Sequence, residues 1–334
     1  MPDEDYARVE YADLNGASAA GFRLICINAD ELPKFADSVS DDFFTERPVI
    51  GVWAWETDHV PARWTRALGL LDEIWVYSSY VAENLGRAAR VPVRRIPPPV
   101  SPPGTDGASL DLGIPAGFRF LFMFDFFSTI QRKNPAGLIE AFRRAFEPGE
   151  GPQLVIKTIN GVHRHEALEE VIWAARGRPD VHVVDRSLSA RERDALVASC
   201  DCYASLHRSE GFGLTLAECM ALGKPVVATA FSGTTDFMTG ENSYLVPYRM
   251  TRVGADCEIY PAEGRWADPD VDAAAQLLRR VVDRPDEAGT KGERARRDIQ
   301  RMYAPAAVGE LIRAELEQMI ALWPETPARA VTAR

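Results

Sequence analysis

Short apolar runs alternate with stretches of helical character along most of the chain, and this alternation restricts the fold more than any other feature. Such a pattern is typical of βαβ units, in which parallel strands form one sheet and helices cover its faces. The runs predict two groups of strands, at residues 22–28, 48–53, 73–77 and 93–96, and then at 118–124, 153–158, 181–184, 202–206 and 225–229. We therefore expect an α/β protein with two sheets.

A segment rich in proline and glycine, residues 97–104, separates the two groups of strands. Such a segment can continue neither a helix nor a central strand, so we interpret it as a stiff linker. The predicted domains are residues 1–104, residues 105–300, and a closing helix with a loose tail at 301–334. Because only four strands are predicted before the linker, we expect the first domain to be reduced, or completed by a partner chain or oligomer.

Composition excludes several classes of protein. The net charge of −11 argues against a protein whose main ligand is nucleic acid. No apolar stretch is long enough for a transmembrane segment, and the charged start Met1-Pro2-Asp3-Glu4-Asp5 does not resemble a signal peptide. The five cysteines are odd in number and show no metal-ligand spacing. We therefore expect a cytoplasmic protein that holds no metal.

The segment 205–218 carries the strongest chemical signal. A predicted strand runs into a loop with Glu210, two glycines follow, and a helix begins that contains Glu218. The first amides of that helix, at residues 213–215, have no acceptor within the helix and can bind a phosphate or a sugar hydroxyl. Because Glu210 precedes the turn and Glu218 lies about one turn inside the helix, the two carboxylates should contact different parts of one ligand.

Two glutamates separated by seven residues with Gly-Phe-Gly between them, followed by the segments 221–229 and 232–236, resemble the donor site of a known enzyme group. The group is the retaining glycosyltransferases of family 4, which have the GT-B fold. The resemblance covers roughly residues 118–282 and, more weakly, 49–100. It implies two Rossmann-like α/β domains facing a cleft, with the closing helix packed back toward the first domain.

The resemblance also implies roles for single residues. Glu210 would contact hydroxyls of the transferred sugar, and Glu218 would bind the ribose hydroxyls of the nucleotide. The backbone of five consecutive residues would hold the sugar and the distal phosphate: Gly211, Phe212, Gly213, Leu214 and Thr215. The alternative is that Glu210 only caps the helix and that Glu218 lies on its solvated face.

Breaking a sugar–diphosphate bond leaves negative charge on the departing phosphate, which needs fixed cations or a metal. Lys133 matches the lysine that the family uses. The family's arginine would fall near Phe127 or Ser128, where this chain has no cation, so Arg132 is the predicted substitute, with a surface charge as the alternative. Further candidate cations are Lys157, His207 and Arg208.

A second candidate segment follows the predicted strand 48–53, where the sequence reads Trp-Ala-Trp-Glu. Some relatives resembling this chain have a Trp-x-Trp-Glu here, so Glu56 is a candidate to contact the reacting sugar or the acceptor hydroxyl. A purely structural carboxylate is the alternative. We expect the indoles of Trp53 and Trp55 to pack in the core.

Together these features predict a retaining, metal-independent transferase of hexosyltransferase type, acting in polysaccharide or glycoconjugate biosynthesis. The donor would be a nucleotide diphosphate sugar, which is a substrate, so no cofactor is expected. The acceptor would be a hydroxyl of a glycan, a glycoconjugate or a small molecule. Two alternatives stay open: a sugar-nucleotide-binding subunit or regulatory module that needs a partner chain, and a sugar-nucleotide epimerase of the same fold.

Overall fold

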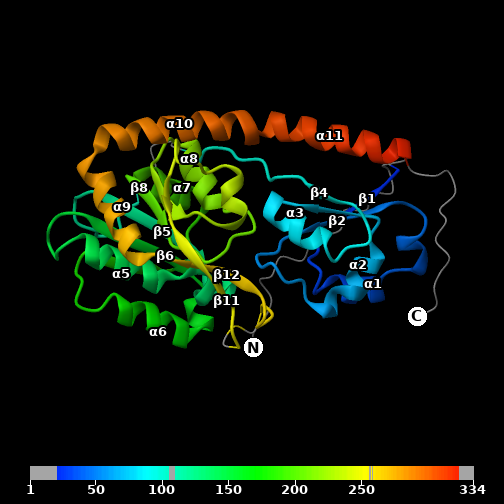
Figure 1. The fold of residues 1–334 in the computed structure, drawn as a ribbon, viewed down its shortest axis with the longest axis horizontal. Coiled ribbons are helices and arrows are strands. Elements are labelled where there is room, and N and C mark those ends of the chain that lie inside the picture. The colour runs from blue at the N-terminus through cyan, green and yellow to red at the C-terminus, as the bar shows by residue number, and fades with distance from the viewer. Residues whose placement is uncertain (1–20, 105–109, 256, 258, 323–334) are drawn as a thin grey trace.

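The structure is a computed structural model that describes residues 21–104, 110–255, 257 and 259–322. The expected lead-in before residue 21 and the expected tail after residue 327 lie outside the described residues. Two parallel sheets with helices lie one beyond the other along the long axis of the molecule (Figure 1). The first sheet belongs to the part of the chain before the linker and the second to the part after it.

The N-terminal sheet has four strands, as the sequence predicts, and they lie side by side in chain order. All pairs are parallel. The strands are β1 (Arg23–Ile25), β2 (Val49–Trp53), β3 (Glu73–Val76) and β4 (Val93–Arg95), and the helices are α1 (Leu32–Ser38), α2 (Thr65–Leu70) and α3 (Ser79–Gly86). Strand β1 is shorter than predicted, because the chain turns at Asn28, whose carbonyl accepts the amides of Glu31 and Leu32.

The C-terminal sheet has six parallel strands in the order β10-β9-β8-β5-β6-β7. The order reverses between the neighbours β5 and β8, and in open α/β sheets ligands bind at the carboxyl ends of the strands beside such a reversal. The strands are β5 (Arg119–Asp125), β6 (Gln153–Ile159), β7 (Val181–Asp185), β8 (Cys202–Ser205), β9 (Val226–Thr229) and β10 (Tyr244–Val246). The helices are α4 (Ile130–Lys133), α5 (Pro135–Ala145), α6 (His165–Ala174), α7 (Ala190–Ser199), α8 (Leu214–Ala221) and α9 (Val271–Asp283).

A hairpin that the sequence analysis did not predict links the two parts of the molecule. Its strands β11 (Tyr248–Arg252) and β12 (Arg265–Pro269) pair antiparallel. Trp266 and Tyr260 of this hairpin belong to the apolar core of the N-terminal sheet, where Tyr260 lies 5.1 Å from the ring of Trp55. The reduced N-terminal domain is therefore filled in part by side chains from later in the same chain.

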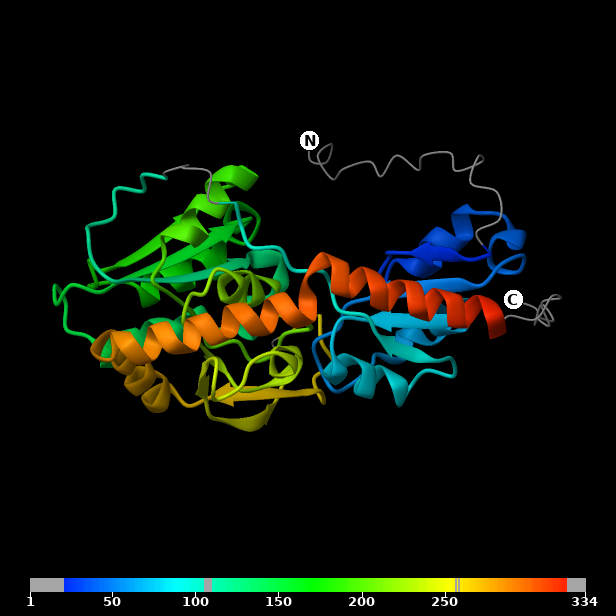
Figure 2. The same cartoon turned by 90° about the horizontal axis from the view of Figure 1, so that it is seen from above.

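Two long helices, α10 (Pro285–Tyr303) and α11 (Pro305–Leu322), follow one another across both parts (Figures 1 and 2). The sequence predicted only one closing helix here. Proline has no amide to donate, so Pro305 stands at the start of a new helix. On α11, Met319 packs with three buried residues of the N-terminal part, Ile50, Trp75 and Ile96.

The proline-rich segment 97–104 is held against the C-terminal part. The amide of Val100 donates to the carbonyl of Tyr303 at 2.7 Å, and the amide of Gly104 donates to Asp194 Oδ2 at 3.0 Å. Val100 also belongs to the apolar core of the C-terminal sheet. The second half of this segment is therefore anchored, and the first half, residues 97–99, leads away from β4.

Replacing Trp266 with alanine tests the role of the hairpin. Trp266 is 2% exposed, so Trp266→Ala should lower the free energy of unfolding by about 3–5 kcal/mol, the usual cost of emptying a buried aromatic site. Urea unfolding followed by circular dichroism gives this value. The matched control is Trp173→Ala, because Trp173 is 69% exposed and its loss should change stability little. Equal effects of the two substitutions would contradict the proposed contribution of the hairpin to the N-terminal core.

Candidate functional site

Four of the predicted site residues meet where strands of both sheets end. Lys133 and Arg132 lie on the short helix α4 that follows β5, and Glu210 lies in the loop after β8. Glu56 follows β2 of the other sheet. The point where the C-terminal sheet reverses its strand order thus faces the end of an N-terminal strand.

These four residues form a cluster of alternating charges, which we call the charge cluster. Lys133 Nζ donates to Glu210 Oε1 at 2.6 Å, and Arg132 Nη1 donates to Glu210 Oε2 at 3.1 Å. Arg132 Nη2 lies 3.9 Å from Glu56 Oε1. Two carboxylates and two cations therefore balance one another across the two domains.

The charge cluster keeps Glu210 ionised although the side chain is buried. Burial alone opposes ionisation, but the nearby charges of Lys133 and Arg132 outweigh it and lower the pKa of Glu210 to about 2. Glu210 is therefore a carboxylate at neutral pH. A buried carboxylate of this kind can accept hydrogen bonds from sugar hydroxyls but holds no proton to donate.

The loop after β5 is built by an asparagine at the start of α5. Asn134 adopts a left-handed backbone with φ of 53°, its side chain accepts the amide of Gly137, and its Nδ2 donates to the carbonyl of Leu206 at 2.9 Å. The carbonyl of Arg132 accepts the amide of Arg208 at 2.7 Å. These two links join the loops that carry Lys133 and Glu210, and the predicted Asn-Pro helix start is confirmed.

The start of α8 depends on two glycines. Gly213 precedes the helix with φ of 94°, a left-handed backbone that suits glycine. Gly233, in the 3-10 turn η5 (Ser232–Asp236), lies so close that a Cβ there would overlap the carbonyl oxygen of Gly211. The amide of Glu210 also donates to Ser232 Oγ at 2.8 Å. The turn η5 therefore packs directly against the loop that carries Glu210.

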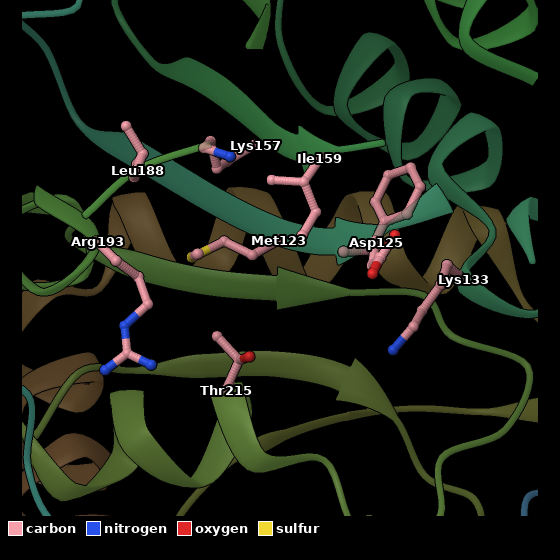
Figure 3. Close-up of a pocket in the computed structure, with 9 residues that line it drawn as sticks. Met123, Asp125, Lys133, Lys157, Ile159, Leu188, Arg193 and Thr215 are labelled. Atoms are coloured by element: carbon pink, nitrogen blue, oxygen red, sulfur yellow. The ribbon is translucent and has the colours of Figure 1, made fainter. Parts of the chain in front are cut away.

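A cavity of about 320 Å³ opens beside the charge cluster. Figure 3 shows Lys133 and Arg193 entering it from opposite sides, with Thr215 at the start of α8 between them. The complete lining is Met123, Phe124, Asp125, Lys133, Lys157, Ile159, Leu188, Arg193 and Thr215. A second, smaller cavity of about 40 Å³ shares Lys133 and Thr215 with it and is also lined by Glu210, Gly213 and Leu214.

Several predicted residues, among them Glu218 and Glu56, do not line these two cavities. Arg132 is turned toward Glu210 and Glu56, as described above. Phe212 is buried in the apolar core, where its ring lies 5.2 Å from that of Phe237. Gly211 lies against the carbonyl of Trp55. Gly211 and Phe212 lie in the chain just before α8 and form no part of the wall of either cavity.

Arg208 was expected near the donor, but the structure directs it toward the hairpin. Its Nη1 donates to the carbonyl of Gln131 at 3.0 Å, and its guanidinium lies 5.8 Å from the ring of Trp266. Its Nη2 lies 3.5 Å from Asp268. Arg208 is not part of the lining of either cavity, because these contacts hold its side chain against β12.

The prediction that His207 serves as a cation is wrong. The side chain is fully buried, and burial lowers its pKa to about 4, so the ring is neutral at pH 7. Its Nδ1 lies 3.0 Å from Ser205 Oγ. Lys157 does line the large cavity, and its Nζ donates to the carbonyls of Thr158 and Arg186. Trp53 and Trp55 are buried, as predicted.

Two residues at the site were missed by the sequence analysis. Tyr260, in the hairpin loop, donates from its hydroxyl to Glu56 Oε2 at 2.9 Å. Arg193, on α7, lies 3.6 Å from Glu218 Oε1 and lines the large cavity. Neither stands in a recognisable motif: Arg193 is one of several charged residues on its helix, and Tyr260 lies in a segment without periodicity.

The two parts of the molecule touch on both sides of the site. Ser209 Oγ donates to the carbonyl of Glu56. Asp236 Oδ2 accepts the amide of Ser79 at 2.8 Å and pairs with Arg95 Nη1 at 3.1 Å. Among the described residues, no group of three or more His, Cys, Asp or Glu is placed to hold a metal ion. In the same part of the chain, no helix combines the length and apolar character that crossing a bilayer requires.

The part of the site that follows the linker lies in a stretch of the chain that matches a known family model. Residues 124–249 match the family model described as Glycosyl transferases group 1. A stretch of 158 residues is 30% identical to the MMP alpha-(1->4)-mannosyltransferase of Mycolicibacterium hassiacum. The match covers 46% of this chain and 33% of that protein, so it spans about a third of the relative's length.

Solved structures extend the likeness over nearly the whole chain. Sucrose-phosphate synthase from Thermosynechococcus elongatus superposes with a TM-score of 0.65 and 18% identity, covering 93% of this chain and 77% of that one. HepE from Anabaena, solved in complex with UDP-glucose, superposes with a TM-score of 0.65 and 14% identity, covering 89% of this chain and 79% of that one. The fold is therefore that of the GT-B glycosyltransferases, with two Rossmann-like domains, as predicted.

Replacing Glu210 with glutamine tests the charge cluster in the folded protein. Because the pKa of Glu210 falls from about 4.5 in an unfolded chain to about 2 in the fold, the ionised group stabilises the protein above pH 4.5. That stabilisation is lost as the pH falls through 2. Glu210→Gln should therefore lower stability at pH 7 by about 3 kcal/mol and weaken the loss of stability between pH 4.5 and 2.

The matched control for this measurement is Glu293→Gln on α10. Arg296 and Arg297 likewise lower the pKa of Glu293 to about 2, but that carboxylate is exposed and solvent screens the pairs. Its replacement should change stability much less. Urea unfolding at a series of pH values measures both variants, and equal losses in the two would contradict the special role of the buried cluster.

Proposed function

We propose that the chain is a retaining glycosyltransferase that moves a sugar, a hexose in our proposal, from a nucleotide diphosphate sugar to an acceptor hydroxyl. The observation that carries the proposal is the ionised Glu210 between Lys133 and the free amides that begin α8. The family match to residues 124–249, which includes Lys133, Glu210 and Glu218, supports it. That a mannosyltransferase is among the relatives and that HepE was solved with UDP-glucose favour a hexose donor.

The nucleotide would lie in the cavity of about 320 Å³. In this proposal Glu218 binds the ribose hydroxyls, and the diphosphate lies between Lys133 and the amides of residues 213–215. A helix start attracts phosphate because its first amides have no intrahelical partner and the helix dipole favours negative charge. The sugar would then lie against Glu210, whose two oxygens can accept hydrogen bonds from sugar hydroxyls.

The reaction would proceed on one face of the sugar. The bond from the anomeric carbon to the leaving phosphate oxygen breaks, the acceptor oxygen bonds to the same carbon from the same side, and the acceptor proton passes to the leaving phosphate oxygen. Retention of configuration follows from this front-face attack. Lys133 and the start of α8 would stabilise the charge that develops on the leaving group, which needs no metal in this proposal.

Arg132 has a different role in this proposal from the one expected at first. Its guanidinium is held by Glu210 and Glu56, so it would set the charge and position of both carboxylates instead of touching the phosphate. Glu56, on the N-terminal side, would meet the acceptor hydroxyl or the reacting sugar. The acceptor itself would be a glycan, a glycoconjugate or a small molecule. The five free cysteines suit a reducing compartment, and we propose the cytoplasm.

The four-stranded N-terminal sheet is small, and a domain that needed a partner chain to complete it would favour the alternative of a binding subunit. The packing of Trp266, Tyr260 and Met319 supports a chain that completes this domain by itself. We therefore propose that the chain transfers sugar without a partner. An assay of the purified chain with a panel of nucleotide sugars and acceptors tests this proposal. Nucleotide binding without turnover would favour the binding subunit. Release of free product sugar in the absence of an acceptor would favour the sugar-nucleotide epimerase.

Replacing Lys133 with methionine tests the proposed stabilisation of the leaving group. Lys133→Met removes the cation beside the diphosphate and should lower the rate of transfer by about 10²–10³-fold, the usual effect of losing one such group. Release of the nucleoside diphosphate is measured at saturating donor. The control is Lys34→Met on α1, because Lys34 is exposed and pairs with the likewise exposed Glu31, three residues before it. Transfer by Lys133→Met at the rate of the parent chain would contradict the proposal.

A further inference from the structure

Arg193 stands at the end of the large cavity opposite Lys133 (Figure 3). It lies on α7, outside the glutamate motif, and the proposed reaction gives it no role so far. Its side chain is 42% exposed, so it is accessible from the cavity. In the proposed arrangement, with the diphosphate beside Lys133, Arg193 lies at the end of the cavity away from the phosphates.

The guanidinium of Arg193 is oriented by its neighbour in the chain. Nε and Nη2 both donate to Asp194 Oδ1, at 3.0 and 2.6 Å. Asp194 is itself held, because its Oδ2 accepts the amide of Gly104. Two of the three nitrogens are thus engaged, and the third, Nη1, lies 3.6 Å from Glu218 Oε1. The contacts with Asp194 therefore orient the guanidinium so that Nη1 faces Glu218.

Arg193 favours the ionised form of Glu218. The Glu218 side chain is only 13% exposed, and burial raises its pKa, as does the nearby charge of Asp194, while the charge of Arg193 opposes that rise. Among the described residues, no hydrogen-bond donor is found on the Glu218 carboxylate, and Arg193, its ion-pair partner, lines the large cavity although Glu218 itself does not. Two hydroxyls of a ribose can both donate to an ionised carboxylate, whereas a protonated one has lost acceptor capacity.

We infer that Arg193 is a positioning residue of the nucleotide site, which holds the Glu218 carboxylate toward the ribose hydroxyls. The inference rests on the proposed function, because it requires a nucleotide in the cavity. In this arrangement Arg193 acts through Glu218 and makes no essential contact with the base or the phosphates. Its contribution to affinity must therefore vanish for a nucleotide that has no ribose hydroxyls.

Isothermal titration calorimetry of the full chain with UDP, GDP and ADP first identifies the nucleoside diphosphate that binds most tightly. For that nucleotide, Arg193→Met should weaken binding by about tenfold, since a well-placed hydrogen bond to a charged group is worth roughly that factor. Arg193→Lys keeps a cation but not the fork and should recover part of the loss. The matched control is Arg191→Met on the same helix, an exposed arginine whose loss should leave the affinity unchanged.

The 2′,3′-dideoxy form of the same nucleotide then distinguishes an effect of Arg193 through Glu218 from a direct contact between Arg193 and the nucleotide. The parent chain should bind it more weakly than the normal nucleotide, and Arg193→Met should bind it as well as the parent does. Equal weakening by Arg193→Met for both nucleotides would overturn the inference, because Arg193 would then contact the nucleotide elsewhere. So would an affinity of Arg193→Met equal to that of the parent for the normal nucleotide.

The pH dependence of binding gives a second readout that a merely structural role would not change. In the parent chain, affinity for the normal nucleotide should fall as the pH drops and Glu218 becomes protonated. In Arg193→Met the opposing positive charge is lost while burial and the charge of Asp194 remain, so the pKa of Glu218 rises further and the fall should begin at a higher pH. Coinciding pH profiles of the two chains would also overturn the inference.

A separate result would show that the proposed function itself has failed. If the parent chain binds none of the three nucleotides, or if Glu218→Gln binds them as tightly as the parent, the nucleotide does not lie where we propose. If only Arg193→Met departs from its expected behaviour, the placement of the nucleotide stands and only the role of Arg193 is removed. Thermal unfolding of each variant without nucleotide confirms that the variants are folded before binding is measured.

Discussion

The buried carboxylate of Glu210 is the group around which the site is organised. Its two oxygens accept hydrogen bonds from Lys133 and Arg132, both on the short helix α4 that follows β5. Arg132 extends the cluster to Glu56 of the other domain. A buried charge is costly unless it is paired, so these contacts hold three separate loops in one arrangement. The alternation of charge leaves the cluster neutral, beside a cavity suited to an anionic ligand.

The N-terminal domain is also held together by segments from elsewhere in the chain. A four-stranded sheet with short helices buries little apolar surface by itself, and small domains are correspondingly marginal. Here the hairpin supplies Trp266 and Tyr260 to its core, and α11 covers another face through Met319. Tyr260 then reaches Glu56 with its hydroxyl. Segments that complete the domain therefore also set the geometry of the site, which couples the stability of this half to the position of a candidate catalytic group.

Local signals predicted those elements whose cause lies within a few neighbouring residues. The apolar runs predicted every strand of the two sheets except the short β10, and Asn134 with Pro135 marked the start of α5. The hairpin β11–β12 was missed, because β11 is mostly exposed and β12 buries the adjacent residues Trp266 and Ala267 against a core that lies far away in the sequence, so neither strand shows the period-two pattern. Tyr260 and Arg193 were missed for the same reason: each acts on a glutamate of another segment, Glu56 and Glu218.

Sequence alone determined the class of fold and placed Glu210 before and Glu218 inside the start of one helix, because periodicity, turn chemistry and motif spacing are properties of the chain itself. Tertiary structure decided the rest. It turned Arg132 toward Glu210 and Glu56, buried His207 until it is neutral, and directed Arg208 to the hairpin. The charge state and direction of a side chain depend on burial and on partners brought together by the fold, and no spacing along the chain specifies them.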